Sequence, residues 1–273
     1  MIFNTIMVQL DVDSPATPRT TYALELARRF EATLIGFAAA DAYVFVPGDD
    51  GGMAAAEIMR QRLTEIEDRL KILKEEFLAV VGDEASWREE IGDPTRLLAM
   101  HARAADLIVA GAPAKGAAND HRRMVDLGTL VLSAGRPVLI AADQLAPPDP
   151  KKVLVAWKDT REARRAVIDA LPFLTSAQDV LVATIEEQNQ KNARESVSDV
   201  LRFLMRHGVK SRSEVLDVGK ADACEAVCEI ARAMSAELVV AGGYGHSRIR
   251  EWAIGGMTRS LLKQGATNRM LSN

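Results

Sequence analysis

The chain has 273 residues, of which 48% are hydrophobic and 26% are charged, the composition of a globular protein with room for two domains. A formal net charge of -4 and a pI near 5.7 give no electrostatic footprint for nucleic acid or an anionic membrane, so we expect neither partner. No apolar run approaches the roughly 18 to 20 residues that span a bilayer, and the N-terminus has no basic region or cleavage site, so we expect a cytoplasmic location.

Strands and helices alternate through the first part of the chain. Apolar runs predict strands over 5–10, 32–39, 85–91, 106–111 and 137–142, and apolar residues at helical spacing predict helices over 18–30, 53–80 and 95–104. The helix over 53–80 is long and amphipathic. Because strands that alternate with helices form parallel sheets, we expect a sheet with helices on both faces.

A proline-rich segment over 146–150 interrupts this pattern. It has three prolines in five residues, the composition of a short stiff linker, so we place a domain boundary there, with domains over 1–145 and 151–273. The pattern then starts again, with strands predicted over 152–157, 179–184, 210–216, 238–242 and 267–272 and helices over 161–174, 193–207 and 221–234. The two halves therefore match in element order.

Short segments of the two halves also match in sequence. Residues 6–10 (IMVQL) align with residues 153–157 (VLVAW), and residues 106–111 (DLIVAG) align with residues 237–242 (ELVVAG). A repeat of domain size indicates duplication. The last predicted strand, over 267–272, is less apolar than its counterpart, so its pairing is the weakest part of the fold prediction.

A glycine-rich loop follows the strand over 238–242. It carries glycines at positions 242, 243, 245, 255 and 256, and the nearest hydroxyl side chains after them are Thr258 and Ser260. Glycine lets a ligand approach the backbone closely, and the free amides at the start of a following helix attract an anion. The loop therefore predicts a phosphate site, although glycines after a strand also serve tight turns without any ligand.

The spacing Gly242-x2-Gly245-x9-Gly255 resembles the glycine motif of the universal stress protein family, and the internal repeat is similar to the tandem form of that family. The resemblance implies two doubly wound, mostly parallel five-stranded α/β sheets of the adenine nucleotide alpha hydrolase-like fold, related by a pseudo-two-fold axis and paired through their last strands. It also implies that ATP phosphates bind to this loop and to small hydroxyl residues after the last glycine. An aspartate at the end of the first strand would contact the adenosine.

Each half departs from the family pattern. The N-terminal half has Asp11 at the end of its first strand, but the glycine spacing over 111–129 is lost. The C-terminal half keeps the glycines, but Lys158 stands at the aspartate position and Gly256 follows Gly255 where the family has a hydroxyl residue. A lysine does not replace an aspartate, because an ammonium group only donates hydrogen bonds.

In the first of three readings, the C-terminal half binds a nucleotide, with ATP and Mg²⁺ as the candidates, or another phosphorylated ligand. Lys158 would add positive charge, and Trp157 would stack on the base because it ends the first strand of that half. The residues at the phosphates would be Gly242, Gly243, Gly245, Gly255, Gly256 and Thr258.

The two other readings concern the N-terminal half. That half could bind the ligand through Asp11, and its phosphate partners would be basic residues of a later loop, Lys115, Arg122 or Arg123. Alternatively, both sites are empty, Asp11 and Asp13 cap the following helix, and the charges over 119–123 form a solvated loop.

The leading functional hypothesis is a ligand-binding or regulatory protein of the stress response, folded as an intramolecular pseudo-dimer, with a homodimer of the whole chain left open. One alternative is a slow ATP hydrolase that activates water with Asp11 or Asp159 and Mg²⁺. Another is a ligand-free interaction module that uses the helix over 53–80 and the loop over 113–126. No catalytic residue or metal site is predicted, because the four histidines lie on different elements and the two cysteines lack a second ligand pair.

Overall fold

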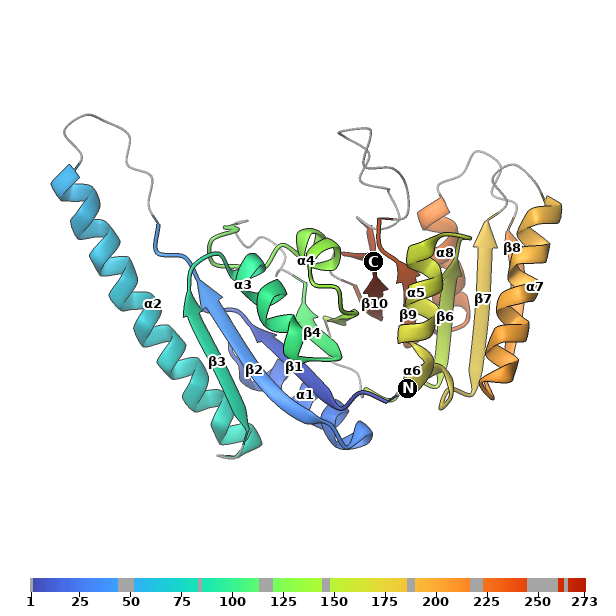
Figure 1. The fold of residues 1–273 in the computed structure, drawn as a ribbon, viewed down its shortest axis with the longest axis horizontal. Helices are drawn as coiled ribbons and strands as arrows, with labels where there is room; N and C mark the ends of the chain where they lie inside the picture. The colour runs from blue at the N-terminus through green and yellow to red at the C-terminus, as the bar shows by residue number, and fades with distance from the viewer. Residues whose placement is uncertain are drawn as a thin grey trace.

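The computed structural model describes residues 2–43, 52–82, 85–112, 120–143, 148–185, 190–216, 223–244, 260–262 and 265–273 (Figure 1). The strands of the N-terminal half are β1 (Thr5–Leu10), β2 (Thr33–Ala40), β3 (Ser86–Ile91), β4 (Leu107–Gly111) and β5 (Val138–Ala141). Those of the C-terminal half are β6 (Lys152–Trp157), β7 (Asp179–Ile185), β8 (Ser211–Leu216), β9 (Leu238–Gly242) and β10 (Asn268–Ser272). Each predicted strand is therefore present within about two residues of its expected bounds.

The ten strands form one continuous sheet in the order β3-β2-β1-β4-β5-β10-β9-β6-β7-β8. Within each half, the described strand pairs are all parallel. β5 and β10 run antiparallel, with Arg269 opposite Ile140 and Leu271 opposite Val138. The predicted pairing through the last strands is thus confirmed, and it joins the two five-stranded sheets edge to edge. The strand order of one half mirrors that of the other, as a pseudo-two-fold axis between β5 and β10 requires.

Helices cover both faces of the sheet, as a doubly wound fold requires. One apolar core lies between the sheet and α1 (Thr17–Phe30), α2 (Gly52–Val81), α5 (Arg161–Asp169), α6 (Leu171–Leu174) and α7 (Gln190–Arg206). The other lies under α3 (Pro94–His101), a 3-10 turn (Ala102–Ala104), α4 (Leu127–Ser133) and α8 (Ala223–Ala233). The long helix α2 and its counterpart α7 lie at opposite ends of the molecule (Figure 1). Among the described residues, no helix has the length and apolar character to cross a bilayer.

Two helices differ from the prediction. The helix expected over 161–174 is broken at Ala170 into α5 and α6, because Pro172 has no amide hydrogen for an intrahelical bond and starts a new turn. The seven-residue helix α4 was not predicted. Its N-cap is Asp126, whose carboxylate accepts a hydrogen bond from the Thr129 amide at 2.6 Å.

An aromatic cluster joins the two halves on the α1 side of the sheet. The ring centroid of Phe3 lies 5.1 Å from that of Phe30 and 5.6 Å from that of Phe173, which belongs to α6. The guanidinium of Arg29 lies 5.2 Å from the Phe30 ring centroid and forms an ion pair with Asp149 at 2.7 Å. Residues on both sides of the proline-rich segment are therefore bound to α1. The domain boundary within 146–150 stays a prediction.

Candidate functional site

The carboxyl ends of β6 and β9 meet at one edge of the C-terminal sheet. The two strands are parallel neighbours, with Ala156 opposite Ala241, so the residues that follow them lie side by side. This edge brings together four of the predicted site residues, Trp157, Lys158, Gly242 and Gly243. Asp11 follows β1 in the other half of the sheet, and Gly245, Gly255, Gly256 and Thr258 lie outside the described residues.

Gly242 is covered by the first turn of α5. A Cβ atom on Gly242 would lie 2.5 Å from the Ala163 backbone nitrogen and 2.8 Å from the Glu162 carbonyl carbon. No Cβ atom is tolerated at such distances from backbone, so only glycine lets α5 come this close to the end of β9. The structure therefore gives Gly242 a packing role, and its contact with a ligand stays a prediction.

Gly243 is also bound within the protein. Its amide donates a hydrogen bond to the Ser272 carbonyl oxygen at 2.8 Å, and its own carbonyl accepts one from Asn273 Nδ2 at 2.9 Å. A Cβ atom here would lie 2.5 Å from Val131 Cγ1 of α4. The amide that a phosphate would need is thus already used by the edge of β10.

Tyr244, which the sequence analysis did not single out, links this loop to the N-terminal half. Its φ of 61° is in the left-handed region, where a residue with a side chain is uncommon. A Cβ atom on Gly128 of α4 would lie only 2.2 Å from the Tyr244 hydroxyl oxygen. Burial and the nearby Asp126 carboxylate raise the pKa of the Tyr244 phenol. The loop after β9 therefore contacts the start of α4 across the junction.

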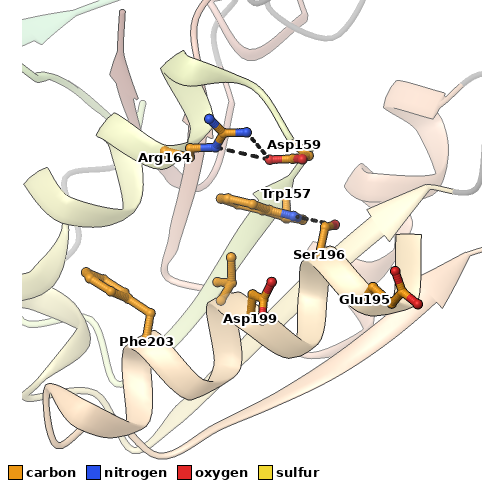
Figure 2. Close-up of a pocket in the computed structure, with 8 residues that line it drawn as sticks. Trp157, Asp159, Arg164, Glu195, Ser196, Asp199 and Phe203 are labelled. Carbon is orange, nitrogen blue, oxygen red and sulfur yellow. Dashed lines mark hydrogen bonds and ion pairs between the residues drawn. The ribbon is translucent and has the colours of Figure 1, made fainter. Parts of the chain in front are cut away.

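A pocket of about 600 Å³ opens between α5 and α7, beside the end of β6 (Figure 2). Its lining residues are Trp157, Asp159, Arg164, Glu195, Ser196, Asp199, Val200 and Phe203. Trp157 is only 6% exposed, and its indole Nε1 donates a hydrogen bond to Ser196 Oγ at 3.2 Å, which fixes the ring against α7. The predicted base-stacking tryptophan thus faces this pocket.

The polar groups of the pocket are mostly acidic. Asp159, Glu195 and Asp199 contribute three carboxylates, and Arg164 contributes a single guanidinium. Arg164 Nε and Nη2 lie 3.1 and 2.6 Å from Asp159 Oδ1, so the guanidinium is bound to one of these carboxylates. The α7 residues were missed from the sequence, although their spacing of three and four residues places them on one side of a helix.

The corresponding position of the N-terminal half is filled by Arg19 of α1. Asp11 is 9% exposed and accepts hydrogen bonds from Gln9 Nε2 at 2.7 Å and Arg19 Nη1 at 3.0 Å. Arg19 Nη1 also donates to the Gln9 carbonyl oxygen at 2.7 Å. A Cβ atom on Gly111 would lie 2.1 Å from Arg19 Nη2, so the guanidinium covers the end of β4. Asp11 therefore binds side chains of its own half.

Two expectations about the N-terminal half are corrected by its contacts. Asp11 and Asp13 do not cap the following helix, because the N-cap of α1 is Ala16, which makes no side-chain cap bond. The charges over 119–123 are not simply solvated: the Arg123 side chain is 13% exposed and binds Asp13 with contacts of 2.6 and 2.7 Å.

The proposed phosphate partners of that half are also engaged. Arg123 Nη2 contacts Glu65 of α2 at 2.9 Å, and Arg122 Nη1 donates to the Tyr43 carbonyl oxygen at 2.7 Å. Lys115 lies outside the described residues. The ion pair with Asp13 lowers the pKa of that carboxyl, mainly through the hydrogen bonds from Arg123.

Histidines and cysteines form no metal site in the described part of the chain, where no group of three His, Cys, Asp or Glu side chains is placed to hold an ion. On the outer edge of the N-terminal half, His101 Nε2 lies 2.5 Å from Glu90 Oε1, and His101 Nδ1 lies 3.2 Å from Arg88 Nη1. Cys224 is buried and Cys228 half-buried, both without a disulfide. These residues lie away from the pocket.

These elements define a tandem, doubly wound α/β protein with a candidate ligand site at one carboxyl edge. The model of the universal stress protein family matches residues 3–142, and this chain belongs to that family. No curated protein matches the chain.

Solved structures of 16% sequence identity share the fold over the whole length. A universal stress protein from Archaeoglobus fulgidus aligns over 99% of this chain and 96% of its own, with a TM-score of 0.72. A protein from Pseudomonas aeruginosa described as a universal stress protein aligns over 99% and 93%, with a TM-score of 0.60. A Pseudomonas aeruginosa protein of unknown function aligns over 99% and 92%, with a TM-score of 0.58. The two-part architecture is therefore shared with other proteins.

Proposed function

We propose that this universal stress protein binds one small molecule, and that the C-terminal half holds it beside the ends of β6 and β9. The observation that carries the proposal is the pocket of about 600 Å³ with Trp157 in its wall. Ligand pockets are clefts of this size, and in open parallel sheets they lie at the carboxyl ends of the strands. In the N-terminal half, Arg19 and Asp11 occupy the corresponding strand ends.

The first candidate ligand is a phosphorylated nucleotide such as ATP with Mg²⁺, as the family resemblance suggests. Its base would enter the pocket against Trp157, and its phosphates would extend toward Lys158, which directly follows Trp157 and is exposed. The remaining phosphate contacts would come from the loop after β9, through Gly245, Gly255, Gly256 and Thr258. Gly242 and Gly243, at the start of this loop, pack on α5 and on the edge of β10.

Binding without turnover is the better supported activity. The two carboxylates that could activate water, Asp11 and Asp159, are each ion-paired with an arginine, at 3.0 Å for Arg19 and 2.6 Å for Arg164. The arginine competes with a water molecule or a metal ion for the oxygen that each carboxylate would use. We therefore expect little hydrolysis of ATP, and an assay of ADP formation tests this point directly.

Tryptophan fluorescence tests the site. In a variant with Trp87→Phe and Trp252→Phe, Trp157 is the remaining tryptophan of the three in the chain. Titration with Mg-ATP should change its emission in a saturable way, and ligand at 100 times its dissociation constant should add about 2.7 kcal/mol to the free energy of unfolding.

Two variants make the test specific. Trp157→Leu should abolish binding, whereas Trp87→Leu should leave it intact, because Trp87 packs against Phe77 in the other half with ring centroids 5.3 Å apart. Mass spectrometry of the freshly purified, denatured protein would show whether a ligand is carried along. If no molecule is released and Mg-ATP leaves both emission and stability unchanged, nucleotide binding is refuted.

A further inference from the structure

We infer that Ser196 of α7 is a positioning residue, which holds the Trp157 ring in the wall of the pocket and so keeps the pocket open for a ligand. The inference rests on the proposed function, because it assigns a role to a residue of the same site. Ser196 acts through its hydrogen bond with the indole ring and not through a contact with the ligand.

The backbone of Trp157 is fixed by the sheet, but its side chain has room to move. Trp157 is the last residue of β6 and lies opposite Thr184 in the parallel pair of β6 with β7. Its ring lines an open volume of about 600 Å³. A pocket of this size accepts a drug-sized molecule and therefore also an indole ring. Without a contact that holds it, the ring can turn into the pocket and take the place of a ligand.

Ser196 supplies such a contact (Figure 2). The indole Nε1 of Trp157 donates a hydrogen bond to Ser196 Oγ at 3.2 Å, and Ser196 Oγ donates in turn to the Ala193 carbonyl oxygen at 3.2 Å. The hydroxyl thus accepts one hydrogen bond and donates another, which a serine can do and an alanine cannot. The orientation of the ring is therefore linked to the backbone of α7.

The helix that carries Ser196 is itself held on the sheet. α7 packs on β7 and β8, and its inner face is formed by Val197, Val200 and Leu204, which are 2%, 8% and 0% exposed. A side chain on a packed helix is positioned more firmly than one on a loop. Ser196 therefore offers the indole an acceptor at a fixed place.

Loss of this acceptor would leave the indole NH in a poor position. Trp157 is only 6% exposed, so water has little access to the ring, and a buried donor without an acceptor is destabilising. The other side-chain oxygens that line the pocket are carboxylates, among them those of Asp159 and Asp199. An indole that turns toward them moves into the pocket and reduces the space for a ligand.

The test follows Trp157 in the full chain carrying Trp87→Phe and Trp252→Phe, with and without Ser196→Ala. Before ligand is added, Ser196→Ala should shift the Trp157 emission to longer wavelength and make it more accessible to quenching by acrylamide, because the ring leaves its buried position. Mg-ATP should bind about three- to tenfold more weakly, because the apparent dissociation constant rises as the fraction of molecules with an open pocket falls.

Two matched variants tie the effect to the hydrogen bond. Ser196→Thr keeps a hydroxyl group and should restore the original emission and affinity. Ser198→Ala removes a nearby hydroxyl of α7 that is exposed and donates to the Arg194 carbonyl oxygen at 2.8 Å, so it should change neither. Thermal unfolding of each variant verifies that the fold is retained.

The outcomes separate this inference from the proposed function. If Mg-ATP binds equally well with and without Ser196→Ala, the role of Ser196 is overturned and the proposed function stands. Equal weakening by Ser196→Ala and Ser198→Ala also overturns it. If Mg-ATP binds to neither protein, nucleotide binding fails, and acrylamide quenching alone decides whether Ser196 holds the ring: equal quenching with and without Ser196→Ala overturns the inference as well.

Discussion

The two halves of the sheet have the same strand order, but the paired helices on one face are arranged differently. In the N-terminal half, α2 is tied to the segment that leads into α1: Arg69 Nε donates to the Val12 carbonyl oxygen at 2.8 Å, and Glu76 accepts from the Ala16 amide at 2.8 Å. In the C-terminal half, α5 lies against β9, and a pocket separates it from α7. The first helix of each half is therefore held by different neighbours on the same arrangement of strands.

The arginine of that first helix also differs. Arg19 points inward to Asp11, and their side chains are 17% and 10% exposed. Arg164 points outward to Asp159, and their side chains are 61% and 53% exposed. One half has thus closed its strand ends with an internal ion pair, whereas the other leaves its charges at the rim of a pocket.

The largest expected effect comes from breaking the contact that anchors α6. Phe173 is 1% exposed and packs between Phe3 and Phe30, so Phe173→Ala should lower the free energy of unfolding by about 3–5 kcal/mol. Phe203→Ala, at the partly buried wall of the pocket, should cost about half as much or less. Chemical denaturation measures both. Equal losses would show that the pocket wall is as tightly packed as the junction.

The next effect concerns the close approach of α5 to β9. Gly242→Ala should cost about 1–3 kcal/mol, because the new methyl group meets backbone atoms that cannot rotate away. It should also push α5 toward α7 and weaken the binding of any ligand in the pocket. Gly111→Ala is the matched change, and the three nearest atoms there belong to the Arg19 guanidinium, which can swing out. A cost for Gly111→Ala above that for Gly242→Ala in thermal unfolding would contradict this explanation.

An effect of similar size separates the two arginines. Arg19→Met leaves the Asp11 carboxylate buried without its cation and should cost about 1–3 kcal/mol. Arg164→Met removes an exposed partner of Asp159 and should change stability by no more than about 0.5 kcal/mol. Denaturant titration of both variants at neutral pH measures the two changes in the free energy of unfolding. Similar losses of stability in the two variants would mean that the ion pair of Arg19 with Asp11 does not stabilise the strand ends of the N-terminal half.

The smallest effect is a pH dependence in the N-terminal half. Arg123 lowers the pKa of Asp13 from its ordinary value of 3.8, so this pair stabilises the fold above that value and loses its contribution as pH falls through the lowered pKa. Arg123→Gln should therefore cost stability at pH 7, and wild type and variant should converge as the pH falls below the lowered pKa of Asp13. The Asp13 side chain is 53% exposed, so solvent screening limits the cost to about 1 kcal/mol.

Arg212→Gln is the control in the C-terminal half for this pH experiment. Hydrogen bonds from Arg212 also lower the pKa of Asp179, but the pair lies at the surface, with side chains 54% and 36% exposed. Its loss should have a still smaller effect, with the same sign. If the difference in unfolding free energy between wild type and Arg123→Gln grew as the pH fell, the explanation by the Arg123–Asp13 ion pair would be wrong.

Much of the fold was predictable because its signals are local. β1 and β9 are continuous apolar runs and have the predicted bounds, and the period of α2 placed that helix within one residue at each end. The helix α4 was not predicted, because it is only seven residues long and follows a polar loop. The split between α5 and α6 follows from Pro172, a signal that was present in the sequence and was not used.

The candidate site was predictable only in part, because it depends on packing between distant elements. The end of the first strand identified Trp157, but the residues of α7 face it because α7 packs on β7 and β8, a contact that no local pattern reveals. The role of Gly242 depends on backbone from another helix, which no spacing of glycines reveals. Likewise, Arg19 reaches Asp11 across a turn and then covers Gly111 on β4, a strand far along the chain.

The antiparallel contact between β5 and β10 has a consequence for biosynthesis. Arg269 of β10 donates to the Ala141 carbonyl oxygen of β5 across a separation of 128 residues, so β5 keeps an unpaired edge while most of the second half is translated. Such an edge is a template for aggregation, and a contact so distant in sequence forms slowly. A nascent chain with its first half folded would therefore expose the edge of β5 until β10 is synthesised and pairs with it.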